Sequence, residues 1–300
     1  MKTTRRQFIQ TSTLAFAALK VGSASGAEPE PTPDKQTALR ICFFTDAHLP
    51  FADTLARLPD AKFHHQERIR TAFDRANAFQ PHAFVFGGDN VFAVDQSQDG
   101  GDKEDNARAQ FENWKSVVAE KVKVPHHSVI GNHDIWHACP KGEDPKRLAL
   151  ASFDMPKRFY SWRMSGWKFV MLDVFDVSAV PVDPEQMAWL EQELVGDEPV
   201  CVVTHAPVLS VTTSLVGGGV GKPKVLRELF YKHPNVRLAL SGHNHMLDAC
   251  EIDQVTYLCG GAVCGAWWEG DYEHCPPAFL ILDLGLTGEV KHQTVLWEKS

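Results

Sequence analysis

The sequence predicts an α/β fold, and three observations support that prediction. Short apolar runs typical of buried strands alternate along the chain with segments whose apolar residues recur at helical spacing. Hydrophobic residues make up 44% of the 300 residues and charged residues 23%, which is ordinary for a globular protein and excludes a disordered chain. No apolar run approaches the roughly 20 residues that a membrane-spanning helix needs, so we expect no integral membrane segment in the mature chain.

Residues 1–27 have the pattern of an export signal. Lys2, Arg5 and Arg6 precede a short apolar stretch, and small residues through Ala27 provide a cleavage site. The arginine pair resembles a twin-arginine signal, which the twin-arginine export machinery reads and which exports folded protein. We therefore expect an exported protein, periplasmic or extracellular. The alternative is an amphipathic N-terminal helix.

Residues 28–37 form a Pro-rich linker, and residues 38–300 read as one domain without internal repeats. The net charge of the whole chain is −8, and removal of the four basic residues in the signal brings it to about −12. Such an acidic chain lacks the basic face that nucleic-acid binding needs, which makes a nuclease unlikely as a class. Seven cysteines are too few for a disulfide scaffold, although pairing among the last four is left open.

Five apolar runs, each expected to be a buried strand, end in polar side chains. The runs cover residues 39–45, 82–86, 127–130, 200–203 and 236–240. The side chains that follow them are, in chain order, Asp46 and His48, Asp89 and Asn90, Asn132, His133 and Asp134, His205, and His243 and His245. In open α/β sheets functional groups gather beyond the carboxyl ends of the strands, so these side chains are candidates for one site.

The segments between these runs carry helical patterns. Apolar residues recur at helical spacing over residues 69–79 and 107–118. Asp183 followed by Pro184 predicts an N-cap with proline at the first helical position. Residues 158–173 and 246–298 show strand patterns with little helix between them, so we expect antiparallel hairpins to join the sheets.

The pooled side chains suit a metal centre. Neutral imidazole and carboxylate or amide oxygen favour borderline divalent ions, and no cysteine is among them, which argues against a structural zinc cage. Each motif alone is compatible with an ordinary polar turn, but five accidental placements after five strands are not a reasonable explanation. The candidate ligands are Asp46, His48, Asp89, Asn132, His205, His243 and His245. Seven ligands exceed one tetrahedral ion and suit two ions that share a carboxylate.

As a set and in this order, these motifs resemble the calcineurin-like metallophosphoesterase superfamily. They are Asp46-x-His48, Gly88-Asp89-Asn90, Gly131-Asn132-His133-Asp134, His205 and Gly242-His243-x-His245. The resemblance implies a four-layer α/β/β/α sandwich with two mixed sheets and a dinuclear site at the carboxyl ends of the strands. It assigns one metal ion to Asp46, His48, Asp89 and His245, and the other to Asp89, Asn132, His205 and His243. Asp89 is then the bridge.

The resemblance also implies the chemistry. Two divalent ions (Mn, Fe or Zn) would supply a metal-bound hydroxide that attacks a phosphate ester of small molecular size, in a phosphodiesterase or a phosphatase. His133 would donate a hydrogen bond to a phosphoryl oxygen or protonate the leaving oxygen, with Asp134 as a candidate to orient it. The alternative for His133 is a structural role in a turn. A rival for the whole protein is a metal-binding scaffold without turnover.

The chain differs from two subfamilies of this superfamily at residues that characterise them. Purple acid phosphatases have a metal-bound tyrosine where Phe92 stands and lack the Asp-x-His pair, and protein Ser/Thr phosphatases have an aspartate there. The chain therefore resembles more nearly the bacterial cyclic-nucleotide phosphodiesterase and nucleotidase branch. Asn90, Trp267 and Trp268 are candidate substrate contacts, the two indoles by stacking on a leaving group. The alternative for the indoles is packing on the sheet.

Overall fold

The computed structural model describes residues 37–51, 60–94, 103–175 and 182–298. The chain divides into a unit of residues 1–30 and a second unit, Pro31–Ser300, which contains every element described below. The predicted signal peptide, residues 1–27, and the linker up to residue 36 lie outside the described residues. Among the described helices, none combines the length and the apolar character of a membrane span.

Two mixed sheets are formed by the described strands. The first has the order β11-β10-β1-β2-β3. Its strands are β1 (Thr37–Phe44), β2 (Ala83–Phe86), β3 (His126–Ser128), β10 (Ala278–Gly285) and β11 (Val290–Leu296). Strands β1, β2 and β3 are parallel, and β10 and β11 join them as an antiparallel hairpin.

The second sheet has the order β4-β5-β6-β7-β9-β8. Its strands are β4 (Tyr160–Met164), β5 (Trp167–Met171), β6 (Val200–Val203), β7 (Val236–Ser241), β8 (Leu247–Ile252) and β9 (Val255–Gly260). Strands β5, β6, β7 and β9 are parallel, and the edge strands β4 and β8 are antiparallel. The antiparallel hairpins expected within residues 158–173 and 246–298 are therefore present.

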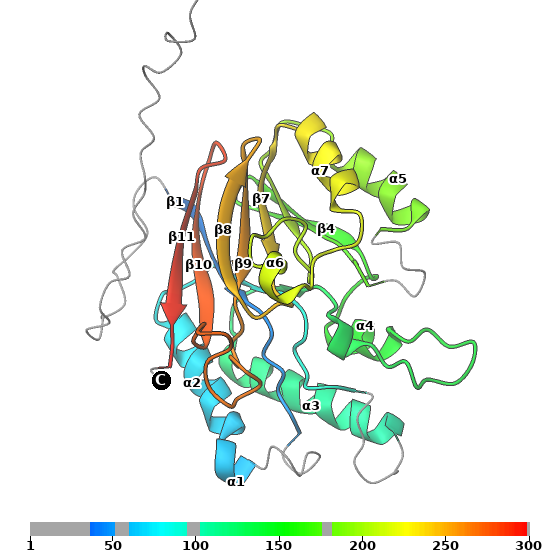
Figure 1. The fold of residues 1–300 in the computed structure, drawn as a ribbon, viewed down its shortest axis with the longest axis vertical. Coiled ribbons are helices and arrows are strands. Elements are labelled where there is room, and N and C mark those ends of the chain that lie inside the picture. Colours follow the sequence, from blue (N-terminus) through cyan, green and yellow to red (C-terminus); the bar gives the residue numbers. More distant parts are fainter. Residues whose placement is uncertain (1–36, 52–59, 95–102, 176–181, 299–300) are drawn as a thin grey trace, which may run out of the picture. The chain divides into compact units, whose positions relative to one another are not determined.

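The helices form the outer layers. They are α1 (Asp60–Phe63), α2 (His65–Asn77), α3 (Lys103–Lys121), α4 (Arg147–Ser152), α5 (Pro184–Glu193), α6 (Thr213–Val216) and α7 (Pro223–Lys232). Figure 1 shows α2 and α3 on one side of the sheets and α5 and α7 on the other. The side chain of Asp183 accepts hydrogen bonds from the backbone amides of Glu185 and Gln186, which confirms the predicted N-cap of α5.

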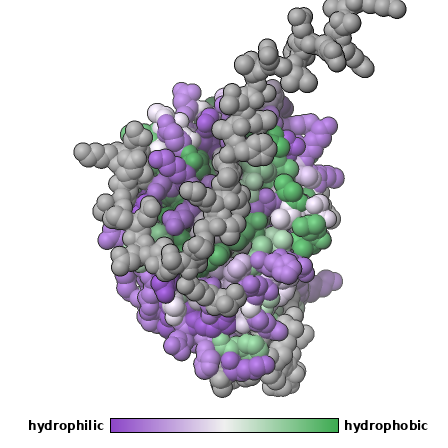
Figure 2. Space-filling model, turned by 60° about the vertical axis from the view of Figure 1, so that its left-hand side comes forward, coloured by the Kyte–Doolittle hydropathy of each residue, from purple (hydrophilic) through white to green (hydrophobic). Residues whose placement is uncertain are grey.

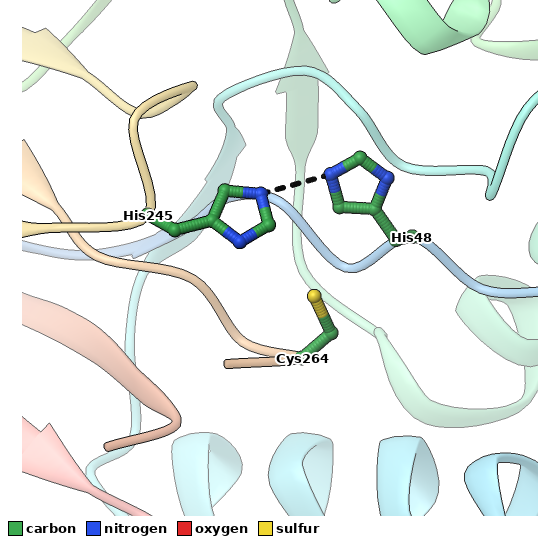
Figure 3. Close-up of side chains that lie close together, drawn as sticks. All are labelled: His48, His245 and Cys264. Atoms are coloured by element: carbon green, nitrogen blue, oxygen red, sulfur yellow. Dashed lines mark hydrogen bonds between the residues drawn. The ribbon is translucent and has the colours of Figure 1, made fainter. Parts of the chain in front are cut away.

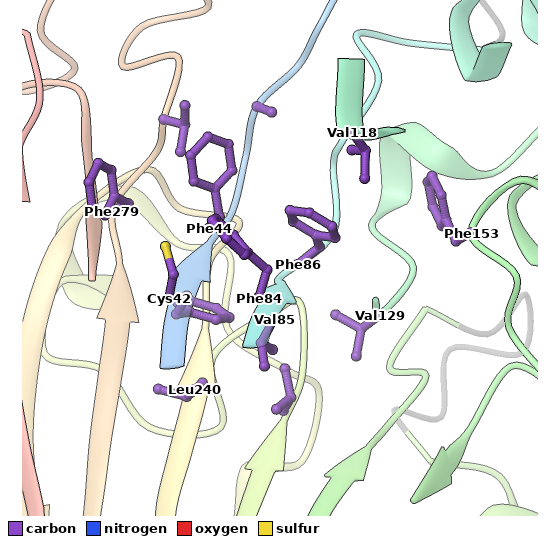
Figure 4. Close-up of a cluster of buried hydrophobic side chains, with 14 of the residues drawn as sticks. Cys42, Phe44, Phe84, Val85, Phe86, Val118, Val129, Phe153, Leu240 and Phe279 are labelled. Atoms are coloured by element: carbon purple, nitrogen blue, oxygen red, sulfur yellow. The ribbon is translucent and has the colours of Figure 1, made fainter. Parts of the chain in front are cut away.

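Packing on the two faces of each sheet explains the layer order. Phe44 of β1 stacks on Phe73 of α2 with ring centroids 4.5 Å apart, so α2 covers the outer face of the first sheet. Figure 4 shows Phe44 beside Phe84 and Phe86 of β2 in this part of the core. On its inner face, Phe43 lies so close to Gly260 of β9 that a Cβ there would meet its ring at 2.7 Å. A second cluster, with Leu190 of α5 among its members, covers the outer face of the second sheet. The expected α/β/β/α order is confirmed.

The surface is mixed in hydropathy, and the cysteines form no disulfide bonds. On the face in Figure 2, hydrophilic side chains are interspersed with smaller apolar areas. All seven cysteines are free, and Cys42, Cys201, Cys259 and Cys264 are buried. The stability of this domain therefore comes from its packed core and its hydrogen bonds, with no disulfide cross-link.

Candidate metal centre

The predicted ligands lie together at the carboxyl ends of strands from both sheets. Asp46, Asp89 and Asn132 follow β1, β2 and β3, whereas His205 and His243 follow β6 and β7. Backbone hydrogen bonds tie neighbouring loops to one another. Asp46 donates to the Gly88 carbonyl (3.1 Å), His48 to the Asp89 carbonyl (2.9 Å) and Gly242 to the His205 carbonyl (2.8 Å). The ligands are therefore carried by connected loops at one end of the sandwich.

Four side chains, which we call the first ligand group, converge on one point: Asp46, His48, Asp89 and His245. The Nε2 atoms of His48 and His245 are 3.1 Å apart. Oδ1 of Asp46 lies 3.8 Å from the Nε2 of His48 and 3.5 Å from that of His245. Oδ2 of Asp89 is 3.5 Å from the Nε2 of His48. All four side chains are buried.

The second ligand group consists of Asp89, Asn132, His205 and His243. The Nε2 of His205 lies 3.1 Å from Oδ2 of Asp89, the same oxygen that faces the first group. Ligand atoms of Asp89, His205 and His243 all lie within 4.8 Å of one another. The Oδ1 of Asn132 is buried without a hydrogen-bond partner among the described residues. Asp89 therefore stands between the two groups, in the position that a bridging ligand requires.

Main-chain carbonyls orient three of the four histidines. The Nδ1 of His205 donates to Gly87 (2.7 Å), and that of His245 donates to Gly265 (2.7 Å). The Nδ1 of His48 makes a longer contact, 3.4 Å, with the Phe92 carbonyl. A hydrogen on Nδ1 leaves the Nε2 lone pair of a neutral ring free to bind a metal ion. The Nε2 atoms are the ones that face the carboxylates.

The ligand loops are held in an uncommon backbone conformation. Five ligand residues have positive φ: Asp46 (53°), His48 (39°), Asp89 (50°), His243 (71°) and His245 (57°). Non-glycine residues in this left-handed region are strained, and such residues cluster at functional sites where the surroundings enforce them. The strain lies in five of the seven residues whose side chains converge, which indicates that the backbone of these loops orients the side chains toward one another.

Two glycines make room for the two carboxylates. A Cβ on Gly131 would lie 2.1 Å from Oδ1 of Asp89, and one on Gly242 would lie 2.1 Å from Oδ2 of Asp46. Neither glycine has a positive φ, so close approach and not backbone freedom explains why glycine stands there. The glycines of the Gly-Asn-His-Asp and Gly-His-Asn-His motifs therefore set the positions of the carboxylates.

The centre contains two buried carboxylates, those of Asp46 and Asp89, which a bound cation would stabilise. Burial opposes protonation of His205, but the carboxylates of Asp89 and Asp46 outweigh it and raise the pKa of this ring to about 9. Burial raises the pKa of Asp46 as well, although His205 and His245 oppose it. No lysine or arginine pairs with either carboxylate in the part of the chain that the structure describes. Divalent cations fit this arrangement of buried carboxylates, imidazoles and an orphan amide oxygen.

His133 lies beside the first ligand group. Its Nδ1 donates to the Phe92 carbonyl (2.6 Å), and its ring meets that of His48 edge-on at 4.6 Å. Its backbone amide donates to Oδ1 of Asp89 (2.8 Å). The Phe92 carbonyl thus occupies the orienting position for which the sequence suggested Asp134.

Asp134 instead holds two ligand loops together. Its Oδ2 accepts from the backbone amides of Asp89 and Gly131, both at 2.9 Å. Its Oδ1 accepts from the amides of Asn90 (3.0 Å) and Val91 (3.3 Å). The side chain is fully buried and faces backbone groups, which explains its place in the motif as a structural one.

The two adjacent tryptophans have different environments. Trp267 is partly exposed and packs on His245 at 4.6 Å and on Tyr272 at 5.7 Å. Trp268 is buried, and its Nε1 donates to the His48 carbonyl (3.0 Å). Trp267 therefore forms a wall of the centre beside His245, whereas Trp268 is buried and stabilises the loop of His48 through the backbone carbonyl of that residue.

Three further residues complete the picture. Asn90 is buried, and its side-chain amide has no hydrogen-bond partner among the described residues. The ring of Phe175 lies 5.5 Å from that of His205 and 5.2 Å from that of His243, both in the second ligand group. Cys264 offers a sulfur within 4.8 Å of His48 and His245 (Figure 3). Sequence reasoning missed Phe175 and Cys264 because neither belongs to a motif.

Comparisons with known proteins agree with this geometry. A model of the calcineurin-like phosphoesterase family matches residues 39–247. A Synechococcus protein named "Probable cyclic nucleotide phosphodiesterase" is 29% identical over 149 residues, which are 47% of this chain and 54% of that protein. A Nostoc protein named "3′,5′-cyclic-nucleotide phosphodiesterase" is 24% identical over 166 residues, 54% of this chain and 59% of that protein. The chain thus spans little more than half the length of these curated relatives.

Solved structures share the fold at low sequence identity. A dimetal phosphatase from Danio rerio superposes with a TM-score of 0.60 at 14% identity, over 87% of this chain and 100% of that chain. GAP50, described as the anchor in the inner membrane complex of Plasmodium, gives 0.56 at 15%, over 87% and 85%. A purple acid phosphatase from yellow lupin gives 0.56 at 15%, over 89% and 55%. At these identities the likeness shows the fold alone.

Proposed function

This chain belongs to the calcineurin-like phosphoesterase family, and we propose that it is a metal-dependent phosphodiesterase with a dinuclear centre. The observation that carries the proposal is the shared oxygen of Asp89. It lies 3.5 Å from the Nε2 of His48 in the first ligand group and 3.1 Å from the Nε2 of His205 in the second. One carboxylate that faces two sets of imidazoles is the arrangement that two-metal hydrolases need.

The two ligand groups are the proposed metal sites. Asp46, His48, Asp89 and His245 would hold one divalent ion, and Asp89, Asn132, His205 and His243 the other, as Mn, Fe or Zn. When bound, such ions lower the pKa of water and clamp the attacking and leaving oxygens at phosphorus. The protein contributes the orientation of these ligands, through main-chain carbonyls on Nδ1 and the left-handed loop conformations.

We assign proton transfer or phosphoryl stabilisation to His133. Because its Nδ1 hydrogen is held by Phe92, its Nε2 is the atom available to a substrate. A ring protonated at both nitrogens donates from Nε2 to a phosphoryl oxygen or to the leaving oxygen. The Phe92 carbonyl holds the orientation of the ring in either state, because it accepts the Nδ1 hydrogen in both.

The proposed substrate is a small phosphodiester, with cyclic nucleotides as the first candidates. The two curated relatives carry that activity in their names, and they support the choice only for the matched half of their length. Trp267 beside His245 and Phe175 beside His205 provide flat apolar walls next to the ligand histidines. A nucleobase or another planar leaving group would stack on such a wall.

The test compares three histidine and aspartate variants of the full chain. We expect Asp89→Ala to lose bound metal and activity together, because both ligand groups share this carboxylate. His133→Ala should keep its metal and lose turnover by about 10²- to 10⁴-fold, the usual contribution of a general acid. His126→Ala is the control, since this exposed residue lies at the opposite end of β3 from Asn132.

Metal content is measured by elemental analysis, and turnover with bis(p-nitrophenyl) phosphate, cyclic AMP, cyclic GMP and p-nitrophenyl phosphate, each with added Mn²⁺ or Zn²⁺. Preference for the diesters over the monoester supports the phosphodiesterase assignment. A wild-type protein that binds metal and hydrolyses no ester would refute the proposal and leave a metal-binding scaffold as the function.

We also propose that the protein acts outside the cytoplasm after export by the twin-arginine machinery. The support is the pattern of residues 1–27, in which Arg5 and Arg6 precede the apolar stretch. Replacement of both arginines by lysine should retain the full-length chain in the cytoplasm, whereas the charge-conserving control Lys2→Arg should not. Cell fractionation followed by immunoblotting distinguishes the two outcomes.

A further inference from the structure

The two imidazoles of the first ligand group face each other through their Nε2 atoms. The Nδ1 of His245 donates to Gly265, and the Nδ1 of His48 donates to Phe92. A neutral ring protonated at Nδ1 has no hydrogen on Nε2, yet the two Nε2 atoms are 3.1 Å apart. Either one proton between the two nitrogens, as in the hydrogen bond drawn in Figure 3, or one metal ion bound to both satisfies such a pair. The pair is therefore a place where a metal ion can replace a proton.

Cys264 reaches the same position from a different part of the chain. It follows β9, is fully buried, and has its Sγ within 4.8 Å of the ligand nitrogens of His48 and His245. Figure 3 shows the sulfur directed toward the space beside the two rings. The backbone amide of Cys264 donates to the Asp46 carbonyl (3.2 Å), which ties its segment to a ligand loop.

The partners of the Cys264 sulfur are main-chain groups, among them the backbone amides of Trp267 and Trp268. The sulfur also makes a long contact of 3.5 Å with the Gly265 carbonyl. Cys259, a buried cysteine on β9, differs in this respect, because its sulfur donates to the Asn244 side chain at 2.9 Å. Of these two thiols, Cys264 is the one that a metal ion in the first ligand group can recruit.

We propose that Cys264 is a sulfur ligand of the metal ion in the first ligand group, an inference that rests on the metal-dependent function proposed above. On binding such an ion, Cys264 would give up its thiol proton to solvent and coordinate through the sulfur. This step needs no oxidant or reductant, because a thiol that coordinates a cation loses its proton outright. The first group then has nitrogen, oxygen and sulfur ligands, whereas the second has nitrogen and oxygen alone.

The sulfur ligand has two consequences for the chemistry. A soft thiolate favours Zn²⁺ or Fe²⁺ over Mn²⁺ or Mg²⁺, so the two groups should differ in metal preference. It also adds a negative charge to the centre. Because Coulomb energy scales with the product of the charges, this weakens the attraction of a dianionic monoester more than that of a monoanionic diester. Cys264 would therefore favour diester substrates.

Cobalt provides the direct test. The full-length protein is stripped of metal with a chelator and titrated with Co²⁺, and its absorption is recorded in the near ultraviolet, where sulfur-to-cobalt charge transfer occurs. We expect this band in the wild type and in the control Cys139→Ser, whose thiol contacts the Glu143 carbonyl and belongs to neither ligand group. Cys264→Ser and Cys264→Ala should lose the band.

Zinc binding gives a second readout. Cys264→Ser should weaken Zn²⁺ binding by at least about tenfold, the range in which changes around a metal site act. Mn²⁺ binding should change by less than about threefold, because this harder ion gains little from sulfur. X-ray absorption at the zinc edge of the wild type needs no variant, and it should show one sulfur at about 2.3 Å among nitrogen and oxygen ligands at about 2.0–2.2 Å.

Several outcomes overturn the inference. The sulfur ligand is refuted if wild-type protein shows neither the charge-transfer band nor a sulfur shell, or if Cys264→Ser keeps the band. A wild type that binds metal and hydrolyses diesters without any sulfur signal refutes this inference and leaves the proposed function intact. A wild type that binds no metal refutes both.

Discussion

Gly242→Ala tests whether close packing sets the position of the Asp46 carboxylate. The new Cβ would lie 2.1 Å from Oδ2 of Asp46 and 2.1 Å from Oγ1 of Thr45, whereas ordinary contact begins at 3.4 Å. The difference requires a displacement of about 1.3 Å. Gly242 has no positive φ, so alanine fits the backbone there and the effect comes from the contacts with Asp46 and with Thr45, which donates to that carboxylate.

The displaced oxygen is firmly held. Oδ2 of Asp46 accepts from the Thr45 hydroxyl (2.6 Å) and from the backbone amide of His243 (2.9 Å). A shift of about 1 Å in a catalytic group lowers rates by on the order of 10²-fold. We therefore expect kcat/KM toward bis(p-nitrophenyl) phosphate to fall about 100-fold. The free energy of unfolding should fall by about 1–3 kcal/mol, as for other overpacked sites.

The assay pairs steady-state kinetics with metal analysis and urea denaturation. Gly219→Ala is the control, since a Cβ at Gly219 would meet its nearest neighbour, Thr213, at 3.4 Å and its φ is not positive. This control should match the wild type within about 0.5 kcal/mol. A folded Gly242→Ala protein that keeps its metal and its kcat/KM within about threefold of the wild type would show that the packing argument is wrong.

Three further predictions concern stability. Lys146→Met removes the closest partner of the buried Asp173 carboxylate, at 2.5 Å, and leaves it Arg158 at 3.4 Å. We expect urea denaturation to show that the free energy of unfolding falls by about 3 kcal/mol, and a fall under about 1 kcal/mol would contradict this. Burial opposes the charge of Asp183, but backbone amides of α5 and the guanidinium of Arg158 outweigh it and lower the pKa of this carboxyl. The charged carboxylate therefore stabilises the fold above the ordinary aspartate pKa of about 3.9, and this stabilisation is lost as pH falls through the lowered pKa. The stability difference between wild type and Asp183→Asn should therefore be full at pH 7 and shrink below about pH 4, and a constant difference would refute the assignment. Removal of metal by a chelator should lower the melting temperature. Mn²⁺ at 100 times its Kd should then raise the free energy of unfolding by about 2.7 kcal/mol in the wild type and not in Asp89→Ala. Equal responses of the two proteins would argue against Asp89 as the shared ligand.

The strands that carry the ligands could be predicted because their hydrophobic runs end sharply. The run over residues 200–203 coincides with β6, and the run over residues 39–45 overlaps β1 over all but its ends. Each run is followed directly by a polar residue or a glycine, namely Asp46, Gly87, Gly131, Thr204 and Ser241. The same contrast between an apolar run and a polar end made the seven ligands visible.

The pairing of the last strands could not be predicted. The segment 246–298 reads as hairpins, but the sequence does not say that β9 inserts beside β7 or that β10 pairs with β1. Such long-range pairing depends on how whole sheets bury their faces. It also brings together residues far apart in the sequence, such as Arg40 of β1 and Asp283 of β10, which form an ion pair. The position of Cys264 follows from this pairing, which is why no local motif revealed it.

The orienting atoms of the centre were invisible for a different reason: they belong to the main chain. Phe92 shows this most clearly, because its side chain is buried while its carbonyl contacts both His48 at 3.4 Å and His133 at 2.6 Å. Side-chain identity at this position separated the chain from two related subfamilies, yet any residue supplies the same carbonyl. One backbone oxygen thus links a proposed metal ligand to the residue proposed to act on the substrate. A substitution that keeps this backbone path keeps the link, so changes of the Phe92 side chain should act through packing and leave the orientation of His133 in place.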